Sequence, residues 1–127
     1  MRWIAGILLA VWPVSVNSHE MTPTYFSFGH SYVESVCVTT MRLFNRREDI
    51  RYYEITVYDD QWNTIPFAAE SRIIELDYLE QTHFDVYVRE SDLDRVEYIC
   101  TRSRLTRGSI EDTGISSRIC SRMERNQ

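Results

Sequence analysis

"HFDVYVRE", residues 83–90, decides the fold of this chain, because its side chains alternate between apolar and polar. Phe84, Val86 and Val88 fall on one face of an extended strand, and the polar residues between them fall on the other. Hydrophobic residues at every second position are typical of a half-buried antiparallel strand. This stretch is therefore predicted to form a strand with one face toward a hydrophobic core.

The same period of two recurs along most of the chain. In "YYEITVYDD", residues 52–60, Tyr53, Ile55 and Val57 share one face, and clusters of turn-forming residues separate such stretches. Strands are expected near 22–28, 33–44, 51–58, 63–67, 71–77, 82–89, 96–105 and 115–122. No segment has an amphipathic helical stripe. Seven to eight short strands predict an all-β protein, an immunoglobulin-like antiparallel β-sandwich.

The expected strand at 33–44 has an irregular pattern. Val36 and Val38 share one face, whereas Met41 and Leu43 have the opposite parity. One extra residue in a strand moves the following side chains to the other face. The pattern therefore predicts a β-bulge near Thr39 and Thr40.

The first residues read as a secretory signal peptide, residues 1–18. Arg2 precedes an apolar run, and Val16 and Ser18 supply the small residues of a cleavage site. The run is shorter than the ~20 residues that a membrane span needs, so no membrane anchor is expected after cleavage. We therefore expect residues 19–127 to form a single domain that is periplasmic or secreted.

The charge of the chain is acidic overall but unevenly placed. Without Arg2 there are 13 arginines, no lysine and 19 acidic residues, which argues against nucleic acid as a partner. Six arginines lie from residue 102 onward. Guanidinium groups suit carboxylates, so Arg102, Arg104 and Arg118 are predicted to bind a protein partner. A solvated face of a hairpin is the alternative interpretation.

The exported chain keeps three cysteines, which in an oxidising compartment predicts one disulfide and one remaining thiol. If 96–105 and 115–122 are adjacent antiparallel strands, Cys100 and Cys120 become cross-strand neighbours. The competing pair is Cys37–Cys100, but the parity of Cys37 relative to Val36 directs its side chain away from the core. Tyr98 is expected to be a core aromatic residue whose hydroxyl group bonds the main chain.

Four stretches resemble, in order, the N-terminal immunoglobulin-like domain of periplasmic pilus-assembly (fimbrial) chaperones. They are "MTPTYFSF" for the first strand, "VCVTTMRLFNR" for the second, "YYEITVYDDQWNTIPF" for the third, and "SRIIELDYLEQTHFDVYVRE" for the strand and hairpin that follow. Together these stretches fall within about residues 22–105. The resemblance implies a β-sandwich that binds another protein during assembly.

The histidines suggest one alternative function. Cleavage after Ser18 would leave His19 as the first residue, and its amine and imidazole together form a copper chelate. His83 and Asp85 share one strand face and complete a candidate copper site. The paired aspartates lie in turns, where aspartate caps main-chain amides. No sequence pattern of a catalytic site is present, so no enzyme activity and no cofactor are expected.

These observations favour an exported, non-enzymatic β-sandwich that binds another protein, as a chaperone or assembly factor. A copper-binding periplasmic protein and a structural surface or virion β module are the alternatives. The oligomeric state is left open.

Overall fold

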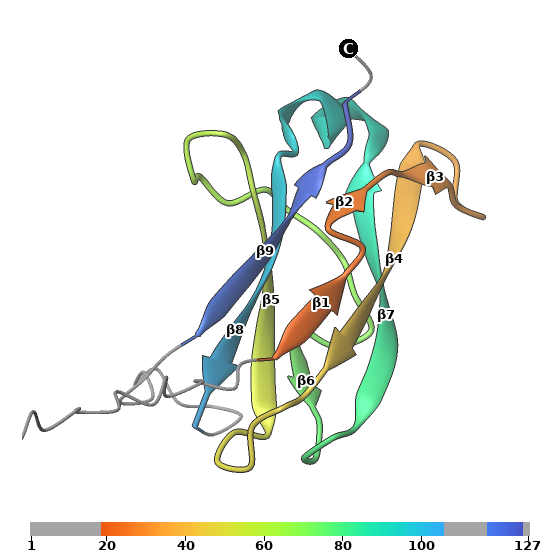
Figure 1. Cartoon of the computed structure of the whole chain (residues 1–127). Coiled ribbons are helices and arrows are strands. Elements are labelled where there is room, and N and C mark those ends of the chain that lie inside the picture. Colours follow the sequence, from red (N-terminus) through yellow and green to blue (C-terminus); the bar gives the residue numbers. More distant parts are fainter. Residues whose placement is uncertain (1–18, 106–116, 126–127) are drawn as a thin grey trace, which may run out of the picture.

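The computed structural model describes residues 19–105 and 117–125, and these form two β-sheets packed face to face (Figure 1). One sheet contains β1 (Glu20–Thr22), β3 (Gly29–His30), β4 (Val36–Phe44) and β7 (Gln81–Arg89), and the other has the order β2 (Tyr25–Phe26), β9 (Arg118–Met123), β8 (Tyr98–Arg104), β5 (Tyr52–Tyr58) and β6 (Ile73–Glu75). A short 3-10 helix, η1 (Glu90–Arg95), joins β7 to β8. The prediction of an all-β sandwich is confirmed.

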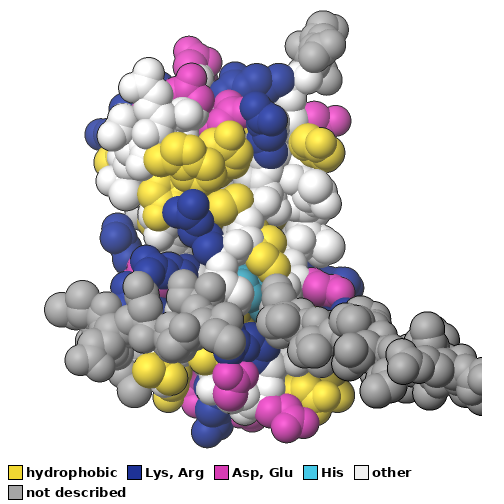
Figure 2. All heavy atoms as spheres, turned by 60° about the vertical axis from the view of Figure 1, so that its left-hand side comes forward, with side chains coloured by type: hydrophobic (Ala, Val, Ile, Leu, Met, Phe, Trp, Pro, Cys, Tyr) yellow, Lys and Arg dark blue, Asp and Glu magenta, His cyan; other side chains and the backbone are white. Residues whose placement is uncertain are grey.

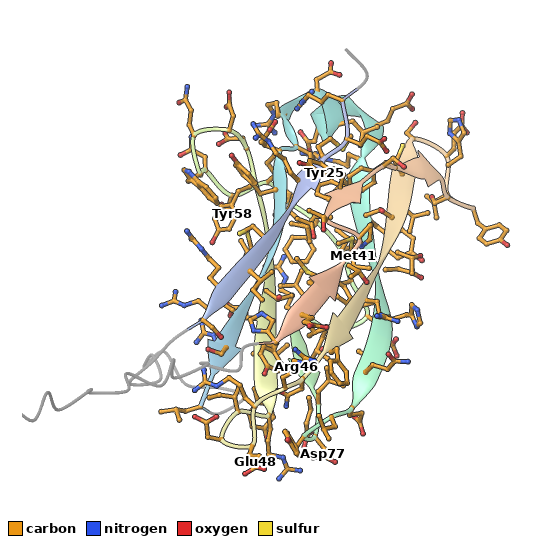
Figure 3. All side chains as sticks on the ribbon, viewed as in Figure 1. Tyr25, Met41, Arg46, Glu48, Tyr58 and Asp77 are labelled. Atoms are coloured by element: carbon orange, nitrogen blue, oxygen red, sulfur yellow. A yellow bond between two sulfur atoms is a disulfide. The ribbon has the colours of Figure 1, made fainter. Side chains whose placement is uncertain are left out.

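Alternating side chains from both sheets form the core. Its buried members include Met41, Leu43, Tyr53, Ile55, Val57, Val86, Val88 and Ile99. Figure 3 shows Met41 between the two sheets and Tyr58, on the other face of β5, pointing away from them. The parity predicted for residues 52–58 and 83–90 is therefore confirmed. Removing this apolar surface from water, at about 25 cal/mol per Å², drives the sheets together.

The predicted β-bulge in β4 is wrong. The register against β7 is continuous, from Val36 opposite Arg89 to Phe44 opposite Gln81. The odd-numbered residues of β4 face the core, and this inner row includes Cys37 and Thr39. The two valines that suggested an inner face lie on the outer side instead. Cys37 is consequently buried, not directed outward, and remains a free thiol.

Two other predicted strands differ in the structure. The single strand expected at 22–28 is divided, because β1 pairs with β4 in one sheet, β2 pairs with β9 in the other, and β3 returns to β4. Pro23, which has no N–H group to donate to a ladder, lies at the first crossing. The strand expected at 63–67 is a loop with one isolated bridge, between Tyr58 and Thr64.

The turn after β4 is held by a buried asparagine. The Asn45 amide nitrogen donates to the main-chain carbonyls of Ile50 and Leu76, at 2.8 and 3.0 Å. Its amide oxygen accepts from the Tyr53 hydroxyl group and from the main-chain N–H of Arg47. Every hydrogen-bonding group of this buried side chain is thus used, which fixes the turn against both sheets.

Residues 1–18 and the polar stretch 106–114, which contain the predicted signal peptide and a predicted loop, lie outside the described residues. Within the described ranges, no helix is both long enough and apolar enough to cross a membrane.

Candidate protein-binding face

The three arginines predicted to bind a partner lie on the outer face of the five-stranded sheet. Arg102 on β8 is directly opposite Arg118 on β9, and Arg104 follows two residues later on the same face of β8. Their surroundings differ. The Arg104 guanidinium lies 3.0 Å from the Glu54 carboxylate, and its side chain is only 20% exposed. Its charge is therefore largely neutralised by an ion pair within the chain. Arg118 is exposed at the first position of β9.

Three aromatic rings form a cluster that contacts Arg118 and Arg122. The rings of Trp62 and Tyr98 are stacked in parallel with centroids 4.2 Å apart, and Tyr58 meets Trp62 edge-on at 5.6 Å. The Arg118 guanidinium carbon lies 4.8 Å from the Trp62 centroid. Arg122, which lies directly opposite Tyr98, has its guanidinium carbon 5.8 Å from the centroid of the Tyr98 ring. Each such cation–π contact contributes about 0.5–1 kcal/mol at an exposed site.

We call these five residues, Tyr58, Trp62, Tyr98, Arg118 and Arg122, the aromatic–arginine face. Figure 2 shows hydrophobic side chains gathered on this side of the molecule with arginine side chains among them. Tyr98 was predicted to lie in the core, and that prediction is wrong. The residue that enters the core from this part of β8 is Ile99, and Tyr98 packs under Trp62 on the outside.

The loop after β5 places Trp62 over the sheet. The Asp59 carboxylate accepts the main-chain N–H groups of Gln61 and Asn63, at 2.9 and 2.8 Å. These bonds, above all the one from Asn63, lower the pKa of Asp59, so the carboxylate stays ionised and holds the turn. Trp62 has a φ of 64°, a conformation that bulky residues rarely adopt. The loop therefore turns sharply, which directs the indole back onto the strands.

A disulfide fixes the two strands under this face. Cys100 and Cys120 are direct cross-strand neighbours, bonded to each other with Cα atoms 4.0 Å apart. This is the favoured pairing from the sequence, although one argument for it was wrong, since Cys37 is buried on the core side of β4. The bond lies in the row between the Tyr98–Arg122 pair and the Arg102–Arg118 pair. It therefore locks the relative position of the flanking side chains.

The two exposed arginines of this face differ in their partners. Glu97 is nearly buried and accepts hydrogen bonds from Arg122 at 2.8 Å and from Arg125 at 3.0 Å. The bond with Arg122 is the largest cause of the lowered pKa of Glu97. Arg122 is thus committed to an internal ion pair. In the part of the chain that the structure describes, the contacts of Arg118 are with aromatic rings.

The predicted copper site is not formed. His19 is 1% exposed, and its Nε2 atom lies 3.2 Å from the Thr101 carbonyl oxygen and 2.9 Å from the Thr101 hydroxyl group. His83 and Asp85 lie on the exposed outer side of β7. The histidine ring lies between the sheets and the other two residues face solvent, so one ion cannot contact all three. Within the described ranges no cluster of three or more metal-ligating side chains exists.

Sequence reasoning selected the three arginines for their clustering near the end of the chain but missed Trp62 as a neighbour of Arg118. Trp62 lies between the strands expected at 51–58 and 63–67, and a residue outside a strand has no parity from which to predict where its side chain points. The one available signal was the run of turn-forming residues at Asp59 and Asp60, which permits a sharp reversal.

No protein-family profile matches the chain, and no curated protein matches its sequence. In structure the chain is similar to the E. coli chaperone DraB, with a TM-score of 0.58 and 16% identity over 84% of this chain and 53% of that chain. This chain therefore spans about half the length of DraB. A FixG-related protein from Vibrio parahaemolyticus is also similar, with a TM-score of 0.48 and 14% identity over 88% of this chain and 100% of that chain. The similarity to DraB confirms the expected immunoglobulin-like β-sandwich fold.

Proposed function

We propose that this chain is an exported, non-enzymatic domain that binds another protein through the aromatic–arginine face. The observation that carries the proposal is the position of the Arg118 guanidinium, 4.8 Å from an indole ring of Trp62 that is 46% exposed. Tryptophan, tyrosine and arginine are the residue types most enriched among the side chains that dominate protein–protein binding energies. Here the three types stand together.

The geometry supports a partner that presents an acidic group beside an apolar one. An acidic side chain or a terminal carboxylate of the partner accepts hydrogen bonds from Arg118, while an apolar side chain beside it packs on the exposed part of Trp62. The disulfide and the Glu97 ion pair hold the surrounding side chains in place before binding. Side chains that are already ordered lose less entropy on binding, so the affinity is higher for the same contact area.

Within this proposal the domain acts as a chaperone or assembly factor. The similarity in fold to the E. coli chaperone DraB supports this role, as does the order of sequence features shared with pilus-assembly chaperones. The proposed location is the periplasm or the extracellular space. Oxidation of Cys100 and Cys120 supports an exported location, because disulfides persist in oxidising compartments.

The test compares two double variants of the exported chain. Trp62→Ala with Arg118→Glu alters the aromatic–arginine face. Arg42→Glu with Tyr32→Ala is the matched control, because both residues are exposed and lie outside this face. Each protein is used to capture partners from a periplasmic extract, and captured proteins are quantified by mass spectrometry.

We expect the first variant to capture at least tenfold less of one or more acidic partners. It should also fail to prevent these partners from aggregating in a light-scattering assay. The matched control should retain both. Equal capture by the two variants would contradict the proposal. Self-assembly of the pure protein in size-exclusion chromatography, with no captured partner, would favour the structural-module alternative.

A further inference from the structure

β7 has one fully paired edge and one open edge. One edge of β7 pairs with β4 along the whole length of the strand. Its other edge makes a single bridge, in which Tyr87 donates to and accepts from Ala68 at 2.9 Å in each direction. Main-chain groups of a strand point to alternate sides, so those of Gln81, His83 and Asp85 point to the same open side as those of Tyr87. Among the described residues, no strand pairs with β7 on this side.

β6 lies across from this edge, in the other sheet, and its outer side is closed differently. The Ser71 hydroxyl group donates to the main-chain oxygen of Ile73 at 2.7 Å and accepts from its main-chain N–H at 3.3 Å. The side chain of Ser71 thus occupies the main-chain groups of Ile73, the first residue of this short strand. An incoming strand finds a longer row of available groups on β7 than on β6.

A groove of about 620 Å³ runs between the two edges. In Figure 1, β6 and β7 are side by side at the lower end of the sandwich. The apolar lining includes Ile73, Ile74 and Phe84, which are partly buried, and the last two also pack against the core. An extended segment paired with β7 directs every second side chain toward this lining.

The rim of the groove is acidic. Glu70, Glu75 and Asp85 line it, and of the described residues that line it none is an arginine. Glu75 also lies 3.7 Å from Arg51. Glu70 and Asp85 have no ion pair within the described ranges, although the Thr40 hydroxyl group donates to Asp85 at 2.5 Å. A basic partner segment is therefore complementary in charge to this rim.

We propose that this groove, bounded by the open edge of β7, is a second docking site, and that it takes one extended partner segment in which apolar and basic residues alternate. The segment hydrogen-bonds the main chain of Gln81, His83 and Asp85, its apolar side chains cover Ile74 and Phe84, and its basic side chains meet the acidic rim. This site goes beyond the aromatic–arginine face, because it lies at another edge and selects the opposite charge.

The test uses synthetic peptides and the intact exported chain. The probe is an eight-residue peptide of alternating valine and lysine, and the comparison peptide alternates valine and glutamate. Binding is measured by titration calorimetry, and its location is mapped by amide hydrogen exchange. We expect the basic peptide alone to bind and to slow exchange at Gln81, His83 and Asp85.

Two further sets of variants separate the parts of the site. Glu70→Lys with Asp85→Lys should weaken binding at least tenfold, whereas Glu34→Lys, an exposed carboxylate outside the groove, should not change it. His83→Pro removes an edge N–H group that does not bond β4, and should weaken binding by a similar factor. If this variant does not fold, the charge variants still decide the question.

Three results would overturn the proposal: no binding of the basic peptide at millimolar concentration, equal binding of both peptides, or slowed exchange away from β7. Trp62→Ala with Arg118→Glu should leave peptide binding intact. Failure of this proposal is thus distinguishable from failure of the proposed function.

Discussion

Acidification should destabilise this protein through one buried histidine, His19. Its ring lies 4.5 Å from the Tyr53 ring, centroid to centroid, and it bonds Thr101 in the opposite sheet. Burial is the main cause that lowers the pKa of His19 to about 4, and the bond to the Thr101 carbonyl opposes it in part. The ring is therefore neutral in the folded protein at pH 5, whereas in the unfolded chain, with a pKa near 6.5, it is mostly protonated.

The size of the effect follows from these two pKa values. Because the unfolded chain binds the extra proton, the stability contributed by neutral His19 is complete above pH 6.5 and is lost as the pH falls toward 4. The loss amounts to about 2 kcal/mol between pH 7 and pH 5, and roughly 3 kcal/mol by pH 4. The carboxylates with lowered pKa values, such as Glu97, lose their contributions mainly at lower pH.

Urea unfolding, followed by circular dichroism at pH 7, 6 and 5 with the disulfide intact, measures this loss. The variant His19→Gln keeps a hydrogen-bonding side chain but has no titrating ring, so its stability should change little over this range. The exposed histidines give matched controls, since His30→Gln and His83→Gln should retain the wild-type dependence. If the wild-type protein and His19→Gln lose the same stability between pH 7 and pH 5, the reasoning is refuted.

Three further predictions concern the disulfide, the free thiol and the buried turn. Replacing Cys100 and Cys120 together by alanine should lower the free energy of unfolding by roughly 3 kcal/mol, measured as a lower urea midpoint; an unchanged midpoint would show that the bond does not constrain the unfolded chain. Without reductant, one thiol per chain, that of Cys37, should react with iodoacetamide, and only after unfolding; rapid labelling of the folded protein would contradict its burial. Asn45→Ala should lower the free energy of unfolding by roughly 3 kcal/mol in the same urea experiment, because it leaves two buried main-chain carbonyls and the Tyr53 hydroxyl group without their partner. Gln61→Ala, at an exposed position, should leave the free energy of unfolding almost unchanged.

The strands that sequence reasoning placed best are those with the strongest contrast between neighbours. Every second residue is apolar from Tyr53 to Val57 in β5 and from Phe84 to Val88 in β7, so the inner face is unambiguous. β4 lacks this contrast. Its inner row includes Cys37 and Thr39, whereas Val36 and Val38 lie outside, so counting apolar residues chose the wrong face and required a bulge that does not exist. Parity is informative only where the two faces differ in polarity.

The candidate site was predictable to the extent that it depends on strand register. Cross-strand pairing of β8 and β9 follows from the two cysteines, and it brings Arg102 and Arg118 together. The position of the Trp62 side chain could not be predicted, because it depends on the path of a loop. The burial of His19 could not be predicted for a related reason. The sequence shows that it follows a predicted cleavage site, but only the packing of β1 against the other sheet reveals that its ring is buried.

Arg118 and the acidic groove are too far apart for one short side-chain contact to serve both. In the order β2-β9-β8-β5-β6, three strand spacings separate β9 from β6, or about 14 Å at the usual distance between neighbouring strands. Arg118 is on β9, and the acidic groove begins beyond β6. Substitutions at one surface should therefore add to those at the other, because distant sites without shared partners rarely couple. If Glu70→Lys with Asp85→Lys abolished capture through Arg118, one partner would have to span both sites.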